Sequence, residues 1–166
     1  IANQFDIDFD NYANVSGEIY ERVSKSKLLN RLNLIKQDLL IIMQKVYRAI
    51  DEPTETLKRE LTNTNVDSSI CQWIASEGKV EYGHLSNFNQ LQQTMDAISQ
   101  LSTELFDILN DDKWLMLEDK RIRVVEIVTE MEMSGDSFIK NIDNLRDEKL
   151  KFESSFSAQG IETEID

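Results

Sequence analysis

Apolar residues recur at steps of three and four over residues 15–50, which is the spacing of one face of an α-helix. A half-buried strand would alternate at every second residue instead. The pattern predicts a long helix whose single apolar stripe packs against other helices. Pro53 ends it, because the proline ring clashes with a continuing helix. The stripe comprises Leu28, Leu32, Ile35, Leu39, Ile42, Val46 and Ala49.

Two further long stripes predict helices over about residues 86–109 and 113–157. Between them, Asn110-Asp111-Asp112 is a turn in which an aspartate caps the next helix. The earlier stripe comprises Phe88, Leu91, Met95, Ile98, Leu101, Leu105 and Ile108. The later stripe comprises Leu117, Val124, Val128, Met131, Phe138, Ile142, Leu145, Phe152 and Phe156.

Shorter helices are expected between the long ones. Residues 51–67 form a polar connection with one turn of helix at 54–61, and a short helix follows over about 69–76. Ser69 opens a capping box of the S-x-x-Q kind, and Gly78 is placed to end the helix.

A helix with one apolar stripe is not stable alone in water, so the stripes must face one another. The chain has only five glycines and one proline, which also favours long helices over turn-rich strands. We therefore expect an all-α fold, an up-and-down four-helix bundle with long antiparallel helices and one short helix. Residues 15–157 form this single sensory or regulatory domain, between an acidic lead-in (1–14) and an acidic tail (158–166) that frays.

The net charge of −13 repels phosphate backbones, which argues against nucleic acid as a partner. The longest aliphatic run, residues 39–43, is far shorter than the ~20 residues of a membrane span, so no membrane insertion is expected. The single cysteine cannot form an internal disulfide. The chain begins at Ile1, and we expect it to be part of a longer protein.

The sequence offers little for catalysis. His84 is the only histidine, so a di-iron bundle with paired E-x-x-H motifs is excluded. Neither a phosphate-binding loop nor a glycine-rich dinucleotide turn is present. We predict that this chain is not an enzyme.

Cys71 and His84 are the candidate metal ligands. A tetrahedral zinc site needs four ligands, and Asp67 or Glu81 would have to supply the others. The competing interpretation makes Cys71 a small, half-buried apolar residue and His84 a loop or cap residue. The apolar side chain of Trp73 is expected to face the bundle.

Three segments resemble the chemoreceptor zinc-binding domain, a four-helix bundle of bacterial chemoreceptors and some diguanylate cyclases. The first is W-I-A-S-E-G-K-V-E-Y-G-H-L-S-N-F-N-Q-L at 73–91. The others are L-I-K-Q-D-L-L-I-I-M-Q-K-V-Y at 34–47 and E-M-E-M-S-G-D-S-F at 130–138. The resemblance implies a methyl-accepting chemotaxis receptor with homodimeric packing.

The family's zinc ligands, three histidines and one cysteine, do not align with such residues here. The first-helix histidine matches Leu39 and the cysteine falls near Ser68. The H-x-x-x-H pair falls at about Met95 and Ser99, or at Thr94 and Ile98 if shifted by one. The resemblance therefore implies the fold and the receptor context without the metal. We expect no cofactor.

These observations predict a sensory or regulatory domain of a bacterial chemoreceptor, on the cytoplasmic side, that passes a signal by helix repacking to the signalling domain of the same receptor. Cys71, Trp73, Tyr82 and His84 form the expected sensory region, with a small molecule as a further ligand. Gly135 interrupts the last stripe, either as a pliable point or to permit close helix contact.

Three alternatives stay open. One is an extracytoplasmic (periplasmic) four-helix domain between membrane spans that binds a small molecule. Another is a metal sensor that uses Cys71, His84 and carboxylates. The third is a structural bundle without a ligand.

Overall fold

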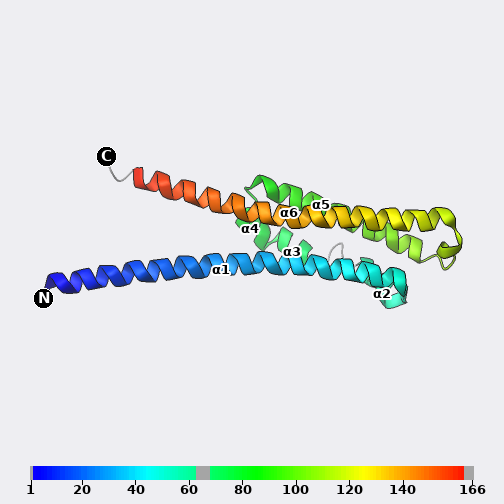
Figure 1. Cartoon of the computed structure of the whole chain (residues 1–166), viewed down its shortest axis with the longest axis horizontal. Coiled ribbons are helices and arrows are strands. Elements are labelled where there is room, and N and C mark those ends of the chain that lie inside the picture. Colours follow the sequence, from blue (N-terminus) through cyan, green and yellow to red (C-terminus); the bar gives the residue numbers. More distant parts are fainter. Residues whose placement is uncertain (1, 63–67, 163–166) are drawn as a thin grey trace. The chain divides into compact units, whose positions relative to one another are not determined.

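The computed structural model describes the backbone of residues 2–62 and 68–162 and the side chains of residues 8–62 and 68–156. Every regular element in these ranges is helical, which confirms the predicted all-α class. The long helices are α1 (Ala2–Asp51), α5 (Ser86–Leu109) and α6 (Glu118–Glu162) (Figure 1). The short ones are α2 (Glu55–Thr62), α3 (Ser69–Ala75), α4 (Glu77–Tyr82) and the 3-10 turn η1 (Trp114–Met116).

The chain divides into two compact units, residues 1–34 and residues 35–166. The first unit is the N-terminal part of α1. We predicted that this helix starts near Val15, but it starts at Ala2, because residues 2–14 contain no glycine or proline that would interrupt it. All side chains from residue 8 to residue 27 are exposed, including an apolar series at Phe9, Tyr12, Ile19 and Val23.

In the second unit, α5 and α6 run antiparallel, side by side (Figure 1). Arg123 of α6 pairs with Glu104 near the end of α5, and Glu148 of α6 contacts Ser86 at its start. The apolar stripe predicted for α5 faces the interior of this unit, and six of its seven members are buried. These buried residues are Phe88, Leu91, Met95, Ile98, Leu101 and Leu105.

Residues 35–51 of α1 also run antiparallel to α6. The ammonium group of Lys36 pairs with Asp143, and eleven residues further along α1 the Tyr47 hydroxyl donates to Glu132. Ile35, Leu39, Ile42, Val46 and Ala49 are buried as predicted. Because α6 continues beyond Asp143 to Glu162, its C-terminal part lies at the end of this unit at which α1 enters.

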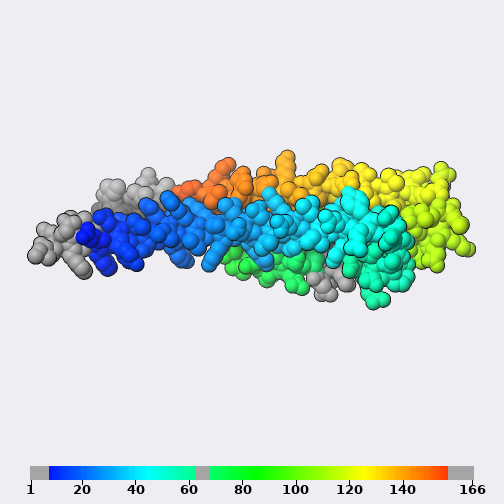
Figure 2. Space-filling model, turned by 60° about the horizontal axis from the view of Figure 1, so that its bottom comes forward, coloured from blue at the N-terminus to red at the C-terminus, as the bar shows by residue number. Residues whose placement is uncertain are grey.

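The three short helices attach to the long ones at separate points. α2 packs against α5 and buries Leu57 and Leu61. Ser69 at the start of α3 donates to Asp38 of α1 at 2.7 Å. Figure 2 shows α3 and α4, in green, beside this later part of α1, in light blue to cyan.

Two details of the short helices differ from prediction. The cap of α3 is Ser68, whose hydroxyl accepts from the amide of Cys71 at 3.2 Å, whereas Ser69 lies inside the helix. Gly78 does not end α3, which stops at Ala75; it lies within α4. A Cβ at Gly78 would lie 2.9 Å from the carbonyl oxygen of Trp73, so the glycine permits α3 and α4 to approach closely.

The last helix also differs at both ends. It begins at Glu118 rather than near Lys113, because residues 114–116 form a 3-10 turn that buries Trp114. The prediction that an aspartate of this turn caps the next helix is wrong: Asp111 accepts from the amide of Lys113 at 3.0 Å within the turn, η1 has no side-chain cap, and α6 begins only at Glu118. Three predicted stripe members of the last helix are exposed, namely Leu117, Phe152 and Phe156.

Leu117 lies before α6 begins, which explains its exposure. At the other end, Lys149 makes the last described ion pair of α6 with α4, and Glu148 makes its hydrogen bonds with the start of α5. All described side chains of α6 beyond that level, at residues 150–156, are exposed. The α6 stripe predicts burial only where another helix lies alongside.

Candidate ligand-binding site

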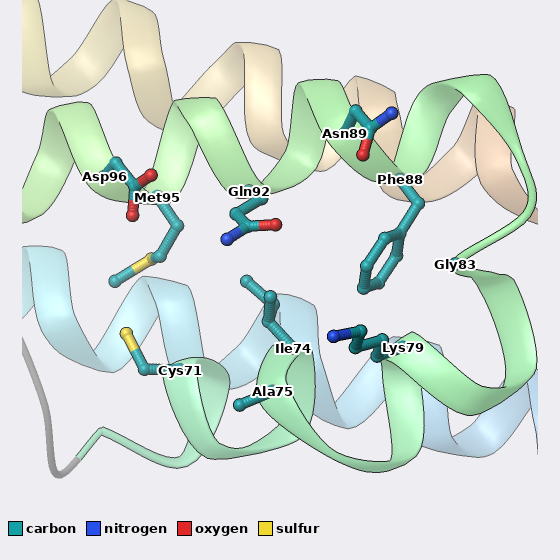
Figure 3. A pocket seen from close by; sticks show the side chains of 10 residues that line it. All are labelled: Cys71, Ile74, Ala75, Lys79, Gly83, Phe88, Asn89, Gln92, Met95 and Asp96. Carbon is teal, nitrogen blue, oxygen red and sulfur yellow. The ribbon is translucent and has the colours of Figure 1, made fainter.

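A pocket of about 520 Å³ opens between the short helices α3 and α4 and the first half of α5 (Figure 3). Its volume lies in the range of about 300–1,000 Å³ that small-molecule sites occupy. The lining residues come from the segment 71–96, which overlaps the predicted sensory region.

The inner surface of the pocket is apolar. Ile74 of α3 and Phe88 and Met95 of α5 are buried there, and the thiol of the half-buried Cys71 points toward Met95 (Figure 3). Met95 is 1% exposed, so its side chain is fixed by the bundle core. This floor gives a ligand apolar surface on which to exclude water.

The outer surface of the pocket is polar. Asn89, Gln92 and Asp96 follow one another on α5 at steps of three and four, so they share one helix face. Lys79 of α4 lies at the opposite end of the pocket from Asp96 (Figure 3). The pocket therefore presents a cation and a carboxylate at its two ends and two primary amides between them.

These four polar side chains make no hydrogen bond or ion pair with any other described residue. Their neighbours are bonded to the protein. The Asn87 amide donates to Glu148 at 2.6 Å, and Lys149 pairs with Glu81 at 2.7 Å. The donors and acceptors of the pocket are therefore available to a ligand, while those around it hold the helices together.

The wall behind the pocket is an aromatic cluster. The ring of Trp73 lies 5.9 Å from that of Tyr82 and 6.4 Å from that of Phe88, between centroids. Trp73 is 2% exposed, which confirms the expectation that it faces the bundle. Burial, together with the nearby carboxylates led by Glu81, raises the pKa of Tyr82 above its ordinary value of 10.0, so its hydroxyl is protonated at neutral pH.

Lys149 connects this cluster to α6. Its ammonium nitrogen lies 4.8 Å from the centroid of the Tyr82 ring and also donates to the backbone carbonyl of Glu81 at 3.1 Å. Cation–π contact and ion pairing thus act on one side chain, which is 8% exposed as a residue. A displacement of α4 therefore acts directly on α6.

The start of α5 is held by a carboxylate from α6. Leu85 precedes the helix and offers no capping side chain. Glu148 instead accepts from the backbone amides of Ser86 at 2.9 Å and of Asn87 at 3.2 Å. Partial burial alone would raise the pKa of Glu148, but the hydrogen bonds from Asn87 and Ser86 outweigh it and lower this pKa below its ordinary value.

The two candidate metal ligands lie at different places in the structure. Cys71 lines the pocket, whereas His84 is exposed after α4 and its ring lies 4.7 Å from that of Phe152, between centroids. Of the proposed helpers, Glu81 is engaged with Lys149, and Asp67 lies outside the described residues. Over residues 8–62 and 68–156 no group of three or more histidine, cysteine, aspartate or glutamate side chains fits a metal ion.

A second, more apolar pocket of about 530 Å³ lies where the end of α1 meets the start of α6. Tyr47, Ile50, Trp114 and Val125 line it. Asp51 is the one charged residue of its lining, and the hydroxyls of Tyr47 and Thr129 already donate to Glu132 and to the Val125 carbonyl. It therefore offers a ligand fewer free polar groups than the first pocket does.

Sequence reasoning found the segment of the first pocket but missed its polar members, namely Lys79, Asn89, Gln92 and Asp96. The spacing of Asn89, Gln92 and Asp96 could have indicated these residues, because it places them on one polar face of the helix, adjacent to the apolar stripe. Such a face is also what a solvated helix surface looks like, so only the position of α3 and α4 distinguishes the two.

No family model, curated protein or solved structure matches the chain. Among the described residues, none of the helices combines the length and the apolar character that crossing a membrane requires.

Proposed function

We propose that this chain is a sensory or regulatory domain of a bacterial methyl-accepting chemotaxis receptor, which converts ligand binding into a shift between packed helices. The observation that carries the proposal is the pocket between α3, α4 and α5, whose unpaired polar groups lie beside contacts that join α4 and α5 to α6. The domain has no catalytic role in this account.

The resemblance to the chemoreceptor zinc-binding domain supports the same context. Met95, which occupies the place of a family histidine, lines the same pocket as Cys71. Leu39, which occupies the place of the family's first-helix histidine, is buried in the core. An apolar filling of this kind is stable without metal, because packed apolar groups avoid the cost of unpaired polar ones. We therefore propose a receptor bundle in which zinc is not the stimulus.

The architecture we propose is a four-helix bundle with three continuous helices. α1 from residue 35, α5 and α6 supply three of its positions, and the successive short helices α2, α3 and α4 supply the fourth. Their separate attachments to α5, α1 and α6 support this arrangement. A segmented fourth position moves more easily than one continuous helix, since each short helix has its own contacts.

The mechanism follows from those contacts. A ligand that draws α4 toward α5 displaces Glu81, and with it Lys149 of α6. The resulting shift of α6 against α1 changes the pairing of Lys36 with Asp143. Packed helices respond by small discrete displacements, which the long rods carry to the signalling domain of the same receptor.

We propose a homodimer on the cytoplasmic side of the receptor. The exposed apolar series of α1, at Phe9, Tyr12, Ile19 and Val23, supports association with a second copy, because a helix with an apolar face gains stability by covering it.

An extracytoplasmic four-helix sensor is the second candidate. One observation favours it, namely that the C-terminal part of α6 lies at the end of the unit of residues 35–166 at which α1 enters. A domain inserted between two membrane spans needs this arrangement. Membrane spans directly before residue 1 and after residue 166 of the parent protein would favour this candidate, and a signalling hairpin without spans would favour the cytoplasmic one.

The test joins the chain to the signalling hairpin of a chemoreceptor and measures kinase output. Ala75 lines the pocket and is exposed, so Ala75→Trp fills the pocket without disturbing the core. Val80 of α4 is exposed outside the pocket, so Val80→Trp is the matched control. We expect Ala75→Trp to change the output and Val80→Trp to leave it unchanged. Equal output from both variants contradicts the proposal and favours a structural bundle.

A further inference from the structure

We propose that the pocket between α3, α4 and α5 binds a short linear peptide of about three residues by its two free ends. This inference rests on the proposed sensory function and names the class of ligand. The peptide carboxylate lies at Lys79, the amino terminus at Asp96, and the peptide groups between them meet Asn89 and Gln92.

The separation of the charges sets the length of the ligand. Lys79 lies near the Phe88 end of the pocket, and Asp96 lies at the other end (Figure 3). Asn89 and Asp96 are seven residues apart on α5, which corresponds to about 10 Å at 1.5 Å per residue. An extended chain spans about 3.3–3.6 Å per residue, so three residues match this length. A single amino acid, whose charges are separated by one Cα atom, cannot reach both ends.

The polar groups between the charges suit a peptide backbone. The side-chain amides of Asn89 and Gln92 each have an NH₂ group that donates and a carbonyl oxygen that accepts. A peptide group has one N–H donor and one carbonyl acceptor, so each amide can bond to either of them. Because the two amides are three residues apart on α5, they face the pocket together. A sugar or a nucleobase would leave the charged groups at the ends without partners.

The apolar floor supplies a place for a side chain of the peptide. Ile74, Phe88 and Met95 line the pocket and are themselves buried, so they present apolar surface to a ligand. They favour an aliphatic residue in the middle of the ligand, which gains stability by leaving water.

The net charge of the protein agrees with a zwitterion. At −13 the chain repels anions, and a dicarboxylate or a phosphate would meet Asp96 as well as that field. A peptide with free ends carries no net charge and places its ammonium group at that carboxylate.

The experiment is calorimetric titration of the full 166-residue chain with the tripeptide Ala-Leu-Ala. Three controls are its N-acetylated form, its C-terminal amide and free leucine. We expect the unblocked peptide to bind, each single block to weaken binding about tenfold or more because it removes a charge-assisted hydrogen bond, and leucine not to bind.

Two variants assign the ends. With Asp96→Asn, we expect the N-acetylated peptide to bind as well as the free peptide, and the C-terminal amide to bind more weakly than both. With Lys79→Met, we expect the C-terminal amide to bind as well as the free peptide, and the N-acetylated peptide to bind more weakly than both. Asp107→Asn and Lys140→Met change exposed charges outside the pocket and should retain the full discrimination. Circular dichroism of all variants confirms that the helices are retained.

Equal affinity for blocked and free peptides, equal affinity for leucine, or no binding by the folded chain overturns the peptide proposal. These outcomes leave the sensory function to be judged by the kinase output of Ala75→Trp. Conversely, a chain that binds the peptide as described while Ala75→Trp leaves output unchanged contradicts the sensory function alone.

Discussion

Glu148 of α6 caps α5 from outside, with Oε1 accepting from the backbone amide of Ser86 at 2.9 Å and from the Ser86 hydroxyl at 2.9 Å. The first amides of a helix have no partner within it, and the residue before α5 is a leucine. The cap is therefore supplied across the bundle, over 62 residues of sequence. One carboxylate satisfies the start of α5 and fixes its position along α6.

Glu148→Ala should lower the free energy of unfolding by about 1–2 kcal/mol, the range for loss of a helix cap. Asp136, exposed on the same helix without a bonded partner among the described residues, provides the control. Urea unfolding followed by circular dichroism measures both, and Asp136→Ala should be close to neutral. A Glu148→Ala protein as stable as the parent would show that the cap contributes nothing.

The same carboxylate should make stability depend on pH. The pKa of Glu148 is lowered in the folded protein from its ordinary value of 4.5, so the unfolded chain binds the proton more readily. The contribution is present above about pH 4.5 and is lost as the pH falls through the lowered folded value. Urea midpoints measured from neutral pH to about pH 3 should fall less steeply for Glu148→Gln than for the parent. Parallel curves would contradict the assignment.

Two glycines should respond in opposite directions to alanine. At Gly78 a Cβ would lie 2.9 Å from the Trp73 carbonyl and 3.0 Å from its ring, so Gly78→Ala forces α3 and α4 apart. We expect a loss of about 1–3 kcal/mol. At Gly135, in the middle of α6, the new Cβ would be 3.9 Å from Leu39, an ordinary contact. Gly135→Ala should therefore stabilise by about 0.5–1 kcal/mol through helix propensity.

The room at Gly135 bears on why a glycine is there. Close helix contact does not require it, because a methyl group fits. The remaining interpretation is that Gly135 lowers the stability of α6 locally and so makes the helix pliable at this point. If Gly135→Ala lowers the unfolding free energy, the space beside Leu39 is not available and this interpretation is wrong.

Ser102 of α5 is fully buried, and its hydroxyl has no hydrogen-bond partner among the described residues. A buried hydroxyl without a partner costs about 1–3 kcal/mol of desolvation. Ser102→Ala removes this hydroxyl with almost no change in volume, so we expect a higher melting temperature. Ser137→Ala, at an exposed position, should change the melting temperature little. A lower melting temperature for Ser102→Ala would mean that the hydroxyl is hydrogen-bonded in solution.

The sequence predicted best where local pattern and tertiary contact agree. The bounds of α5 followed from its stripe, because the stripe members from Phe88 to Leu105 are all buried, Phe88 among them against Trp73 of α3. The spacing also predicted that Phe152 and Phe156 are buried, but both are exposed. They continue the α6 stripe beyond Lys149, which pairs with Glu81 of α4. The spacing of apolar residues shows which face of a helix is apolar, but that face is buried only where another helix packs against it.

The candidate site was predictable in position only. Trp73 and Cys71 indicated the segment, while the charged residues Lys79 and Asp96, which line the pocket, look like any solvated charge in the sequence. Their relation exists only once α4 lies opposite α5. The cap by Glu148 was hidden for the same reason, since nothing near Ser86 in the sequence indicates a distant carboxylate.

The central claim, that α6 moves against α1 to carry the signal, is tested most directly by locking the two helices. Lys36→Cys and Asp143→Cys, in a Cys71→Ala background, place thiols where the native ion pair joins α1 to α6. A short bis-methanethiosulfonate reagent bridges them and is removed by reduction. Asp136→Cys with Lys140→Cys, both exposed on α6, is the control bridge within one helix.

The measurement is the kinase output of the chain joined to a chemoreceptor signalling hairpin, before bridging, after bridging and after reduction. We predict that the bridge between α1 and α6 changes the output, that reduction restores it, and that the bridge within α6 has no effect. Output that is the same in all three states for the α1–α6 bridge would contradict signalling by helix displacement.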